Sequence, residues 1–160
     1  MQLTTSLCEK ISLLLQSKKW MLATAESCTG GLIAAACTEL AGSSLWFERG
    51  FVTYSNASKS ELLSIPKHVI DLNGAVSETV VRAMAAGALA NSNAQVSLSV
   101  TGIAGPGGGT ADKPVGTVWF GWCVQGKTYV ECLQISGDRT QVRESTAVHS
   151  LSRLATFLQA

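Results

Sequence analysis

Charged residues are scarce in this chain, and the basic ones do not cluster. Of 160 residues, 12 are Lys or Arg and 11 are Asp or Glu, which leaves a net charge of +1. A nucleic-acid groove needs clustered cations, so we expect no nucleic-acid partner. No apolar run approaches the roughly 18 residues that cross a membrane. The first segment carries Glu9 and Lys10 in its middle, unlike a signal peptide, so we expect no membrane association.

Metal-ligand motifs are also missing. The chain has only two histidines, His68 and His149, and neither Cys-x-x-Cys nor His-Glu-x-x-His occurs. We therefore expect no metal site and no cofactor. Five cysteines with no close pair are typical of reduced thiols, which favours a cytoplasmic protein.

The apolar pattern that is present predicts an α/β fold. With 46% hydrophobic and 14% charged residues, the chain suits one domain over residues 1–160. Apolar spacing predicts helices and strands that alternate early, followed by a hairpin. We expect helices over 3–15, 31–40, 57–63, 77–90 and from 138 onward, and strands over 20–26, 49–54, 95–100, 116–124 and 127–135. This order predicts a single three-layer α/β/α domain around a mixed sheet of about five strands.

The most informative segment joins the first predicted strand to the next helix. It reads Thr24-Ala25-Glu26-Ser27-Cys28-Thr29-Gly30-Gly31. A helix N-terminus has unpaired amides and partial positive charge, so Ser27 there suits a nucleophile or an anion site. The alternative is that Ser27 or Thr29 merely caps the helix. The two glycines favour a backbone that a ligand approaches closely.

A glycine-rich loop follows a later strand. Residues 102–109 contain five glycines and one proline. They match neither a P-loop nor the dinucleotide-binding fingerprint. The loop is either a flexible connection or a backbone-lined pocket for a small polar ligand, because ligands bind at the carboxyl edge of α/β sheets.

Other polar residues offer chemistry to such a pocket. Lys59 can act as a general base if burial lowers its pKa, and Tyr54 can relay a proton or hold Lys59. Otherwise Lys59 is a solvated surface charge. Arg139 can clamp a phosphate or form an ordinary surface ion pair. A Ser-His-Asp triad with His68 or His149 is a further arrangement.

Together these segments resemble one family, the CinA C-terminal domain family of nicotinamide-nucleotide amidohydrolases. The resemblance rests on the Ser27 segment and on five others: Gly50–Asn56 with Lys59, Gly74–Glu78, Thr101–Gly109, Lys113–Val118 and Gly137–Arg139. It covers nearly the whole chain in order. The chain is similar to the stand-alone bacterial form, without the extra N-terminal domain of longer CinA proteins.

The resemblance implies a reaction and a set of site residues. The reaction is hydrolysis of nicotinamide mononucleotide (NMN) to nicotinic acid mononucleotide and ammonia, a step in pyridine nucleotide salvage. Ser27 would be the nucleophile, Lys59 its base, and Tyr54 would link or orient them. Oxyanion donors are expected among the amides near Thr29–Gly30 or Gly102–Ile103. The expected substrate-binding residues are Thr29, Gly30, Gly31, Asn56, Thr101, Gly102, Ile103, Ala104, Gly105 and Arg139.

Three other functions and one assembly state follow from the same residues. The chain can be a non-catalytic nucleotide-binding paralogue, a serine amidase for an unrelated amide, or a thiol enzyme. The thiol would be Cys28, because a helix N-terminus stabilises a thiolate. Apolar helical faces in excess of one small sheet, together with the resemblance, predict a homodimer.

Overall fold

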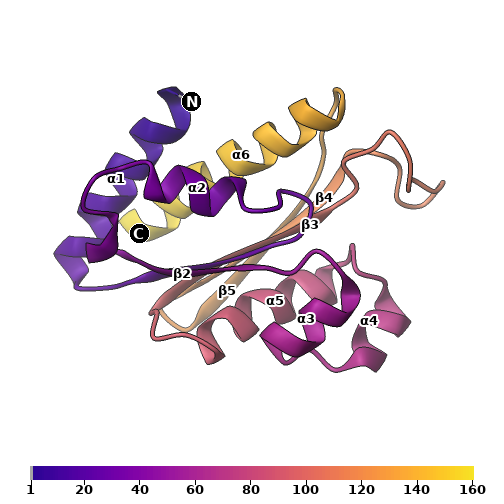
Figure 1. Cartoon of the computed structure of the whole chain (residues 1–160), viewed down its shortest axis with the longest axis horizontal. Coiled ribbons are helices and arrows are strands. Elements are labelled where there is room, and N and C mark those ends of the chain that lie inside the picture. The colour runs from indigo at the N-terminus through magenta and orange to yellow at the C-terminus, as the bar shows by residue number, and fades with distance from the viewer. Residues whose placement is uncertain (1) are drawn as a thin grey trace.

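A five-stranded mixed sheet runs through the middle of the computed structural model, which describes residues 2–160 (Figure 1). The strand order is β2-β1-β3-β4-β5. The strands are β1 (Leu22–Glu26), β2 (Phe47–Val52), β3 (Val96–Gly102), β4 (Thr117–Val124) and β5 (Lys127–Gln134). The predicted fold class and the five strands are confirmed.

Strand direction determines which chain segments meet at one edge. Strand β1 pairs in parallel with both β2 and β3, whereas β3–β4 and β4–β5 are antiparallel. The carboxyl ends of β1, β2 and β3 therefore lie at the same edge, next to the start of β4. All five residues of β1 are buried, as expected for a parallel strand covered on both faces.

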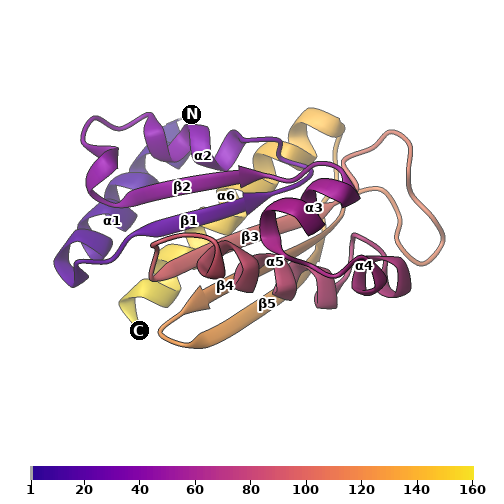
Figure 2. The same cartoon turned by 60° about the horizontal axis from the view of Figure 1, so that its bottom comes forward.

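Helices cover both faces of the sheet (Figures 1 and 2). One face carries α1 (Gln2–Lys18), α2 (Leu32–Thr38) and α6 (Arg139–Gln159), and the other carries α3 (Asn56–Leu63), α4 (Lys67–Asn73) and α5 (Glu78–Ala90). Each layer buries its own apolar cluster, for example Ile11 and Leu151 on the first face and Leu63 and Met84 on the second. None of the described helices has the length and apolar character needed to cross a membrane.

Two short elements were not predicted from the sequence. The 3-10 turn η1 (Ser43–Leu45) precedes β2, and α4 begins directly after Pro66. Helix α4 buries only Ile70. With one buried residue among seven, α4 shows no helical repeat of apolar residues in its sequence, which explains why this helix was not predicted.

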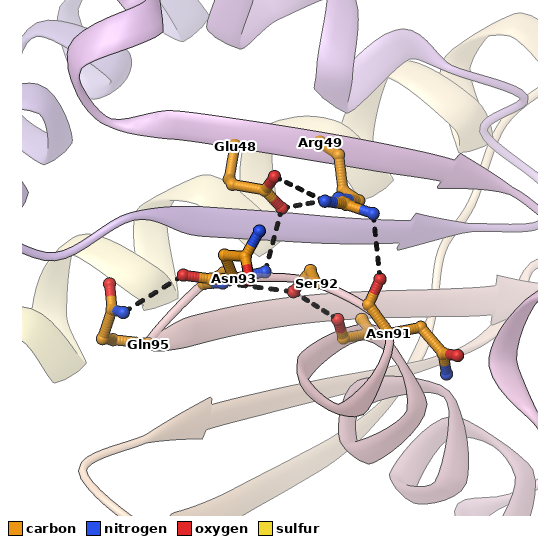
Figure 3. A network of polar contacts seen from close by, with 8 residues as sticks. Glu48, Arg49, Asn91, Ser92, Asn93 and Gln95 are labelled. Carbon is orange, nitrogen blue, oxygen red and sulfur yellow. Dashed lines mark hydrogen bonds and ion pairs between the residues drawn. The ribbon is translucent and has the colours of Figure 1, made fainter.

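A polar network fixes the edge strand β2 to the turn between α5 and β3 (Figure 3). Arg49 Nε and Nη2 donate to the carboxylate of Glu48 (2.6 and 2.8 Å). Arg49 Nη1 donates to the carbonyl of Asn91 (3.1 Å). The amide of Asn93 donates to Glu48 Oε2 (3.3 Å). The network holds β2 in place, and the segment that follows β2 supplies part of the site described next.

Candidate active site

Ser27 lies at the carboxyl end of β1, beside a pocket of about 280 Å³. Its amide donates to the carbonyl of Val100 on β3 (3.1 Å), which continues the sheet by one residue. Its carbonyl accepts from the amide of Gly30 (3.1 Å), which closes a turn. The N-cap position of α2 is Gly31, so the interpretation of Ser27 or Thr29 as a simple helix cap is wrong.

Glu26, which we did not predict as a functional residue, takes over the capping. Its carboxylate accepts from the Thr29 hydroxyl (2.6 Å) and from the amides of Gly31, Ile33 and Ala34 (3.2, 2.9 and 3.0 Å). A carboxylate at a helix N-terminus is favoured by the helix dipole and by charge-assisted hydrogen bonds. The available signal was an acidic residue at the end of an otherwise uncharged strand. Because its oxygens are occupied, Glu26 anchors α2.

Lys59 is the most unusual side chain of the site. It lies one turn before Leu63 on the buried face of α3 and is 1% exposed. Its Nζ lies 3.1 Å from Ser27 Oγ, 2.9 Å from the carbonyl oxygen of Thr53 and 3.3 Å from that of Tyr54. Within residues 2–160, no carboxylate forms an ion pair with Lys59. Burial lowers its pKa below the ordinary lysine value, which favours the neutral amine.

The two carbonyls around Lys59 decide where a neutral amine directs its lone pair. A carbonyl oxygen can only accept, so Thr53 and Tyr54 each take one N–H of Lys59. A neutral amine has two N–H bonds and one lone pair. With both N–H groups bonded, the lone pair remains for the third neighbour, Ser27 Oγ. A neutral Lys59 amine would thus turn its lone pair to Ser27 Oγ, whereas the protonated ammonium would donate its third N–H to that oxygen.

Tyr54 contributes differently from what we expected. Its side chain is 62% exposed, and its hydroxyl accepts from Arg139 Nη2 (3.2 Å). Only its backbone carbonyl contacts Lys59. The expected side-chain link from Tyr54 to Lys59 is wrong for this structure, because the ring extends outward from the strand end toward α6.

Arg139 lies at the mouth of the pocket as the first residue of α6. Its Nη1 donates to the carbonyl of Gly105 (2.7 Å), while Asp138 and Gln141 form a capping box around the helix start. Contact with both Gly105 and Tyr54 fixes the guanidinium. An anion at this mouth would meet an exposed arginine in a defined position.

The pocket gathers most, but not all, of the predicted binding residues. Its lining is formed by Ser27, Cys28, Tyr54, Asn56, Lys59, Ala75, Val76, Thr101, Gly102, Ala104 and Arg139. Ala75 and Val76 were not predicted individually. They lie between α4 and α5, where the Thr101 hydroxyl donates to the carbonyl of Ala75 (2.9 Å). The Gly74–Glu78 segment noted in the sequence was the available signal.

Other predicted binding residues support the pocket from outside its lining. The amides of Gly30 and Ile103 donate to the carbonyls of Ser27 and Thr117 (3.1 and 3.0 Å), so neither is free for an oxyanion. The Gly31 amide is bound by Glu26, and Thr29 is fully buried with its hydroxyl on that same carboxylate. Gly105 contributes its carbonyl to Arg139.

Gly102 remains as a backbone donor in the pocket wall. Along β3, amides alternate between the two neighbouring strands. The Ile103 amide bonds to β4, and the Ser27 amide bonds to Val100, so the Gly102 amide faces the side of Ser27. A Cβ at Gly102 would lie 2.7 Å from Val118 Cγ2 and 3.2 Å from Cys28 Sγ, so only glycine fits here.

The cysteine and histidine alternatives lose support in this geometry. Cys28 is 5% exposed, and burial raises the pKa of its thiol to about 11. The thiol therefore stays protonated near neutral pH, unlike a reactive cysteine. His68 is exposed on α4, and His149 lies 2.8 Å from Glu131. Neither histidine lines the pocket, so a Ser-His-Asp triad is not formed.

The sequence model of the CinA C-terminal domain matches residues 4–158. The chain belongs to the CinA C-terminal domain family. The resemblance inferred from the sequence motifs is thereby confirmed.

Curated relatives of this family member fall into two length classes. A protein from Enterobacter agglomerans named nicotinamide-nucleotide amidohydrolase PncC is 55% identical, over 89% of this chain and 87% of the relative. The protein of the same name from Escherichia coli K12 is 46% identical over 96% and 94%. A putative competence-damage inducible protein from Symbiobacterium thermophilum is 47% identical, but this chain covers only 37% of its length.

Solved structures agree with the fold. The competence/damage inducible protein CihA from Agrobacterium tumefaciens has a TM-score of 0.95 and 41% identity, covering 99% of this chain and 96% of that chain. The competence damage-inducible protein A from Klebsiella pneumoniae gives 0.94 and 35%, with 98% and 97% covered. The α/β architecture is thus that of solved CinA-family proteins.

Proposed function

We propose that this family member is an amidohydrolase that converts NMN and water to nicotinic acid mononucleotide and ammonia. The names of the Enterobacter and Escherichia relatives support the substrate class. The observation that carries the chemistry is the buried Lys59 Nζ, which lies within hydrogen-bond distance of two carbonyl oxygens and of Ser27 Oγ. In a neutral amine, the two carbonyls take the N–H groups and the lone pair is left for the serine. A serine activated by a neutral lysine can attack a carboxamide without a histidine.

The proposed reaction has two stages. Lys59 takes the hydroxyl proton of Ser27 as Oγ bonds to the carboxamide carbon. The resulting Lys59 ammonium then gives this proton to the amide nitrogen as its C–N bond breaks, and ammonia leaves. Water then attacks the nicotinoyl ester of Ser27, again through Lys59, and releases the acid. The Gly102 amide faces the side of Ser27, so we assign it to the developing oxyanion.

The two ends of the pocket suit the two ends of this substrate. The deep end offers Ser27 and Lys59, and the wall beside it offers the small side chains of Ala75 and Ala104 to an aromatic ring. The mouth offers Arg139, held by Gly105 and Tyr54, to a phosphate. The carboxamide itself is neutral, so the phosphate is the anionic group by which the enzyme would hold this substrate.

The phosphate contact predicts how Arg139→Ala changes the kinetics. We expect a loss of about tenfold to a hundredfold in kcat/KM, mainly through KM, because a charge-assisted hydrogen bond of ~1.5–3 kcal/mol remote from the amide is lost. Ammonia release should be measured with NMN and with its riboside, which lacks the phosphate. Wild type should prefer NMN, and the variant should lose this preference.

Lys67→Ala is the control, because Lys67 lies on α4 and pairs only with exposed Asp71. An Arg139→Ala enzyme that still discriminates NMN from the riboside as well as wild type would contradict the phosphate assignment. Pure wild-type protein that binds NMN without releasing ammonia would instead identify a nucleotide-binding paralogue.

We also propose that the protein acts in the cytoplasm as a homodimer. Leu3 and Leu13 of α1 and Leu45 of η1 leave more than half of their side-chain surface exposed, and association would cover such surface. Light scattering at micromolar concentration should give twice the chain mass of 16.8 kDa. A mass of one chain under those conditions would refute the dimer.

A further inference from the structure

Arg143, which lies outside the pocket lining, contacts the turn that carries Ser27. It extends from α6, 115 residues away in sequence, and its Nε donates to the carbonyl of Cys28 (3.0 Å). Its Nη2 donates to the carbonyl of Thr29 (3.0 Å). These are the two carbonyls that directly follow Ser27. One guanidinium thus holds two successive peptide groups of the turn.

The local backbone shows why such a clamp matters. Gly30 has φ +58 and Gly31 has φ +107. Glycine adopts these left-handed conformations freely because it has no Cβ. A Cβ at Gly30 would lie 3.4 Å from Arg143 Nη2, so the guanidinium lies close to the turn. A turn with two glycines can adopt several conformations, and each would move the preceding serine.

Opposite charges hold the two ends of this turn. Glu26 accepts from the amides that begin α2, and Arg143 donates to the carbonyls of Cys28 and Thr29. A peptide group is planar, and its C=O and N–H point in opposite directions. Fixing the two carbonyls therefore also fixes the orientation of the amides of Thr29 and Gly30.

We propose that Arg143 is a positioning residue that keeps Ser27 Oγ within reach of Lys59; this rests on the proposed serine chemistry. The fork of the guanidinium is what the role requires, because two donors in one rigid plane bind both carbonyls at once. Lysine keeps the charge but is a point donor that cannot reproduce this fork. Arg143 does not line the pocket, so it acts on kcat rather than on substrate affinity.

The test compares Arg143→Lys and Arg143→Met with Arg153→Met. Arg153 lies on the same helix, is also half-buried and pairs with Glu131, away from the pocket. We expect both Arg143 variants to lose on the order of tenfold to a hundredfold in kcat for NMN, with KM little changed, because small misplacements of reacting groups cost about this much. Arg153→Met should lose stability but keep kcat when assayed well below its melting temperature.

A second readout does not depend on the substrate. The rate at which a fluorophosphonate probe labels Ser27, followed by mass spectrometry, should fall in both Arg143 variants and stay unchanged in Arg153→Met. If wild type is labelled but releases no ammonia from NMN, the proposed substrate is wrong, while the labelling rates still test the role of Arg143.

Full rescue by Arg143→Lys would show that only the charge of Arg143 matters. Wild-type kcat and labelling rates in both Arg143 variants would overturn the proposal. A wild type that shows neither reaction would contradict an activated Ser27 and both proposals with it.

Discussion

Replacing Ser27 with alanine is expected to reduce ammonia release from NMN by about 10⁴-fold or more while the fold is retained. Among residues 2–160, the Ser27 hydroxyl is the one group hydrogen-bonded to the buried Lys59 amine that can attack, because the other two partners are carbonyl oxygens. The neighbouring thiol of Cys28 cannot replace it, since burial raises its pKa to about 11. Ser27→Cys should keep a trace of activity, because a thiol is a competent nucleophile in a different position.

The matched control for Ser27→Ala is Ser97→Ala. Ser97 is a fully buried serine on β3, and its hydroxyl donates to the carbonyl of Ala85 rather than to a site residue. This variant should lose about 1 kcal/mol of stability and keep its kcat. Thermal melting and ammonia release should be measured on the same samples. A Ser27→Ala protein that melts earlier but turns over normally would show that the serine is structural.

Lys59→Met and Lys59→Arg are both expected to lose on the order of 10²- to 10⁴-fold in kcat/KM, the usual contribution of a general base. Methionine fills a similar volume without a basic nitrogen. Arginine restores a positive charge but stays protonated at any accessible pH, so it cannot accept the serine proton. An active Lys59→Arg enzyme would mean that position 59 supplies charge alone.

The Lys59 variants need a control for folding, because the position is 1% exposed. Lys67→Met removes an exposed lysine from α4 that pairs with Asp71, and should leave both activity and stability nearly unchanged. Circular dichroism and thermal melting should show that Lys59→Met keeps its fold, since it removes a buried amine with no counter-ion. If Lys59→Arg does not fold, the kcat/KM of the folded Lys59→Met variant alone decides whether Lys59 is the base.

Local sequence patterns predicted the layers of this fold but not its smallest elements. The alternation of helices and strands predicted the mixed sheet, because each long element has an apolar face of the right period. Helix α4 has one buried residue, Ile70, and such a helix is specified by its packing on α5 rather than by its own pattern.

The site shows a different division between what local sequence can predict and what it cannot. The motif positions identified Ser27 and Lys59, because a family resemblance points to residues without reference to their contacts. The resemblance could not show that the Tyr54 side chain bonds to Arg139 while its carbonyl bonds to Lys59. It also missed Glu26 and Arg143, whose roles depend on contacts between the Ser27 turn and two different helices. The Arg143 contacts join segments about 115 residues apart and have no local sequence signal. Glu26 bonds to residues only three to eight positions ahead, and an acidic residue at the end of an uncharged strand was its signal.

The central claim is that a neutral Lys59 activates Ser27, and the pH dependence of kcat/KM for NMN tests it most directly. This profile reports the ionisation of the free enzyme. The base acts only when unprotonated, so kcat/KM should rise with pH through the pKa of Lys59. Burial lowers that pKa, so the midpoint should lie below the ordinary lysine value of about 10.4. Measured above about pH 7, where a phosphate monoester is fully ionised, wild type should show this ascending limb, and the residual activity of Lys59→Arg should lack it. A profile that is flat or that falls with rising pH in wild type, or an ascending limb that persists in Lys59→Arg, would contradict the account.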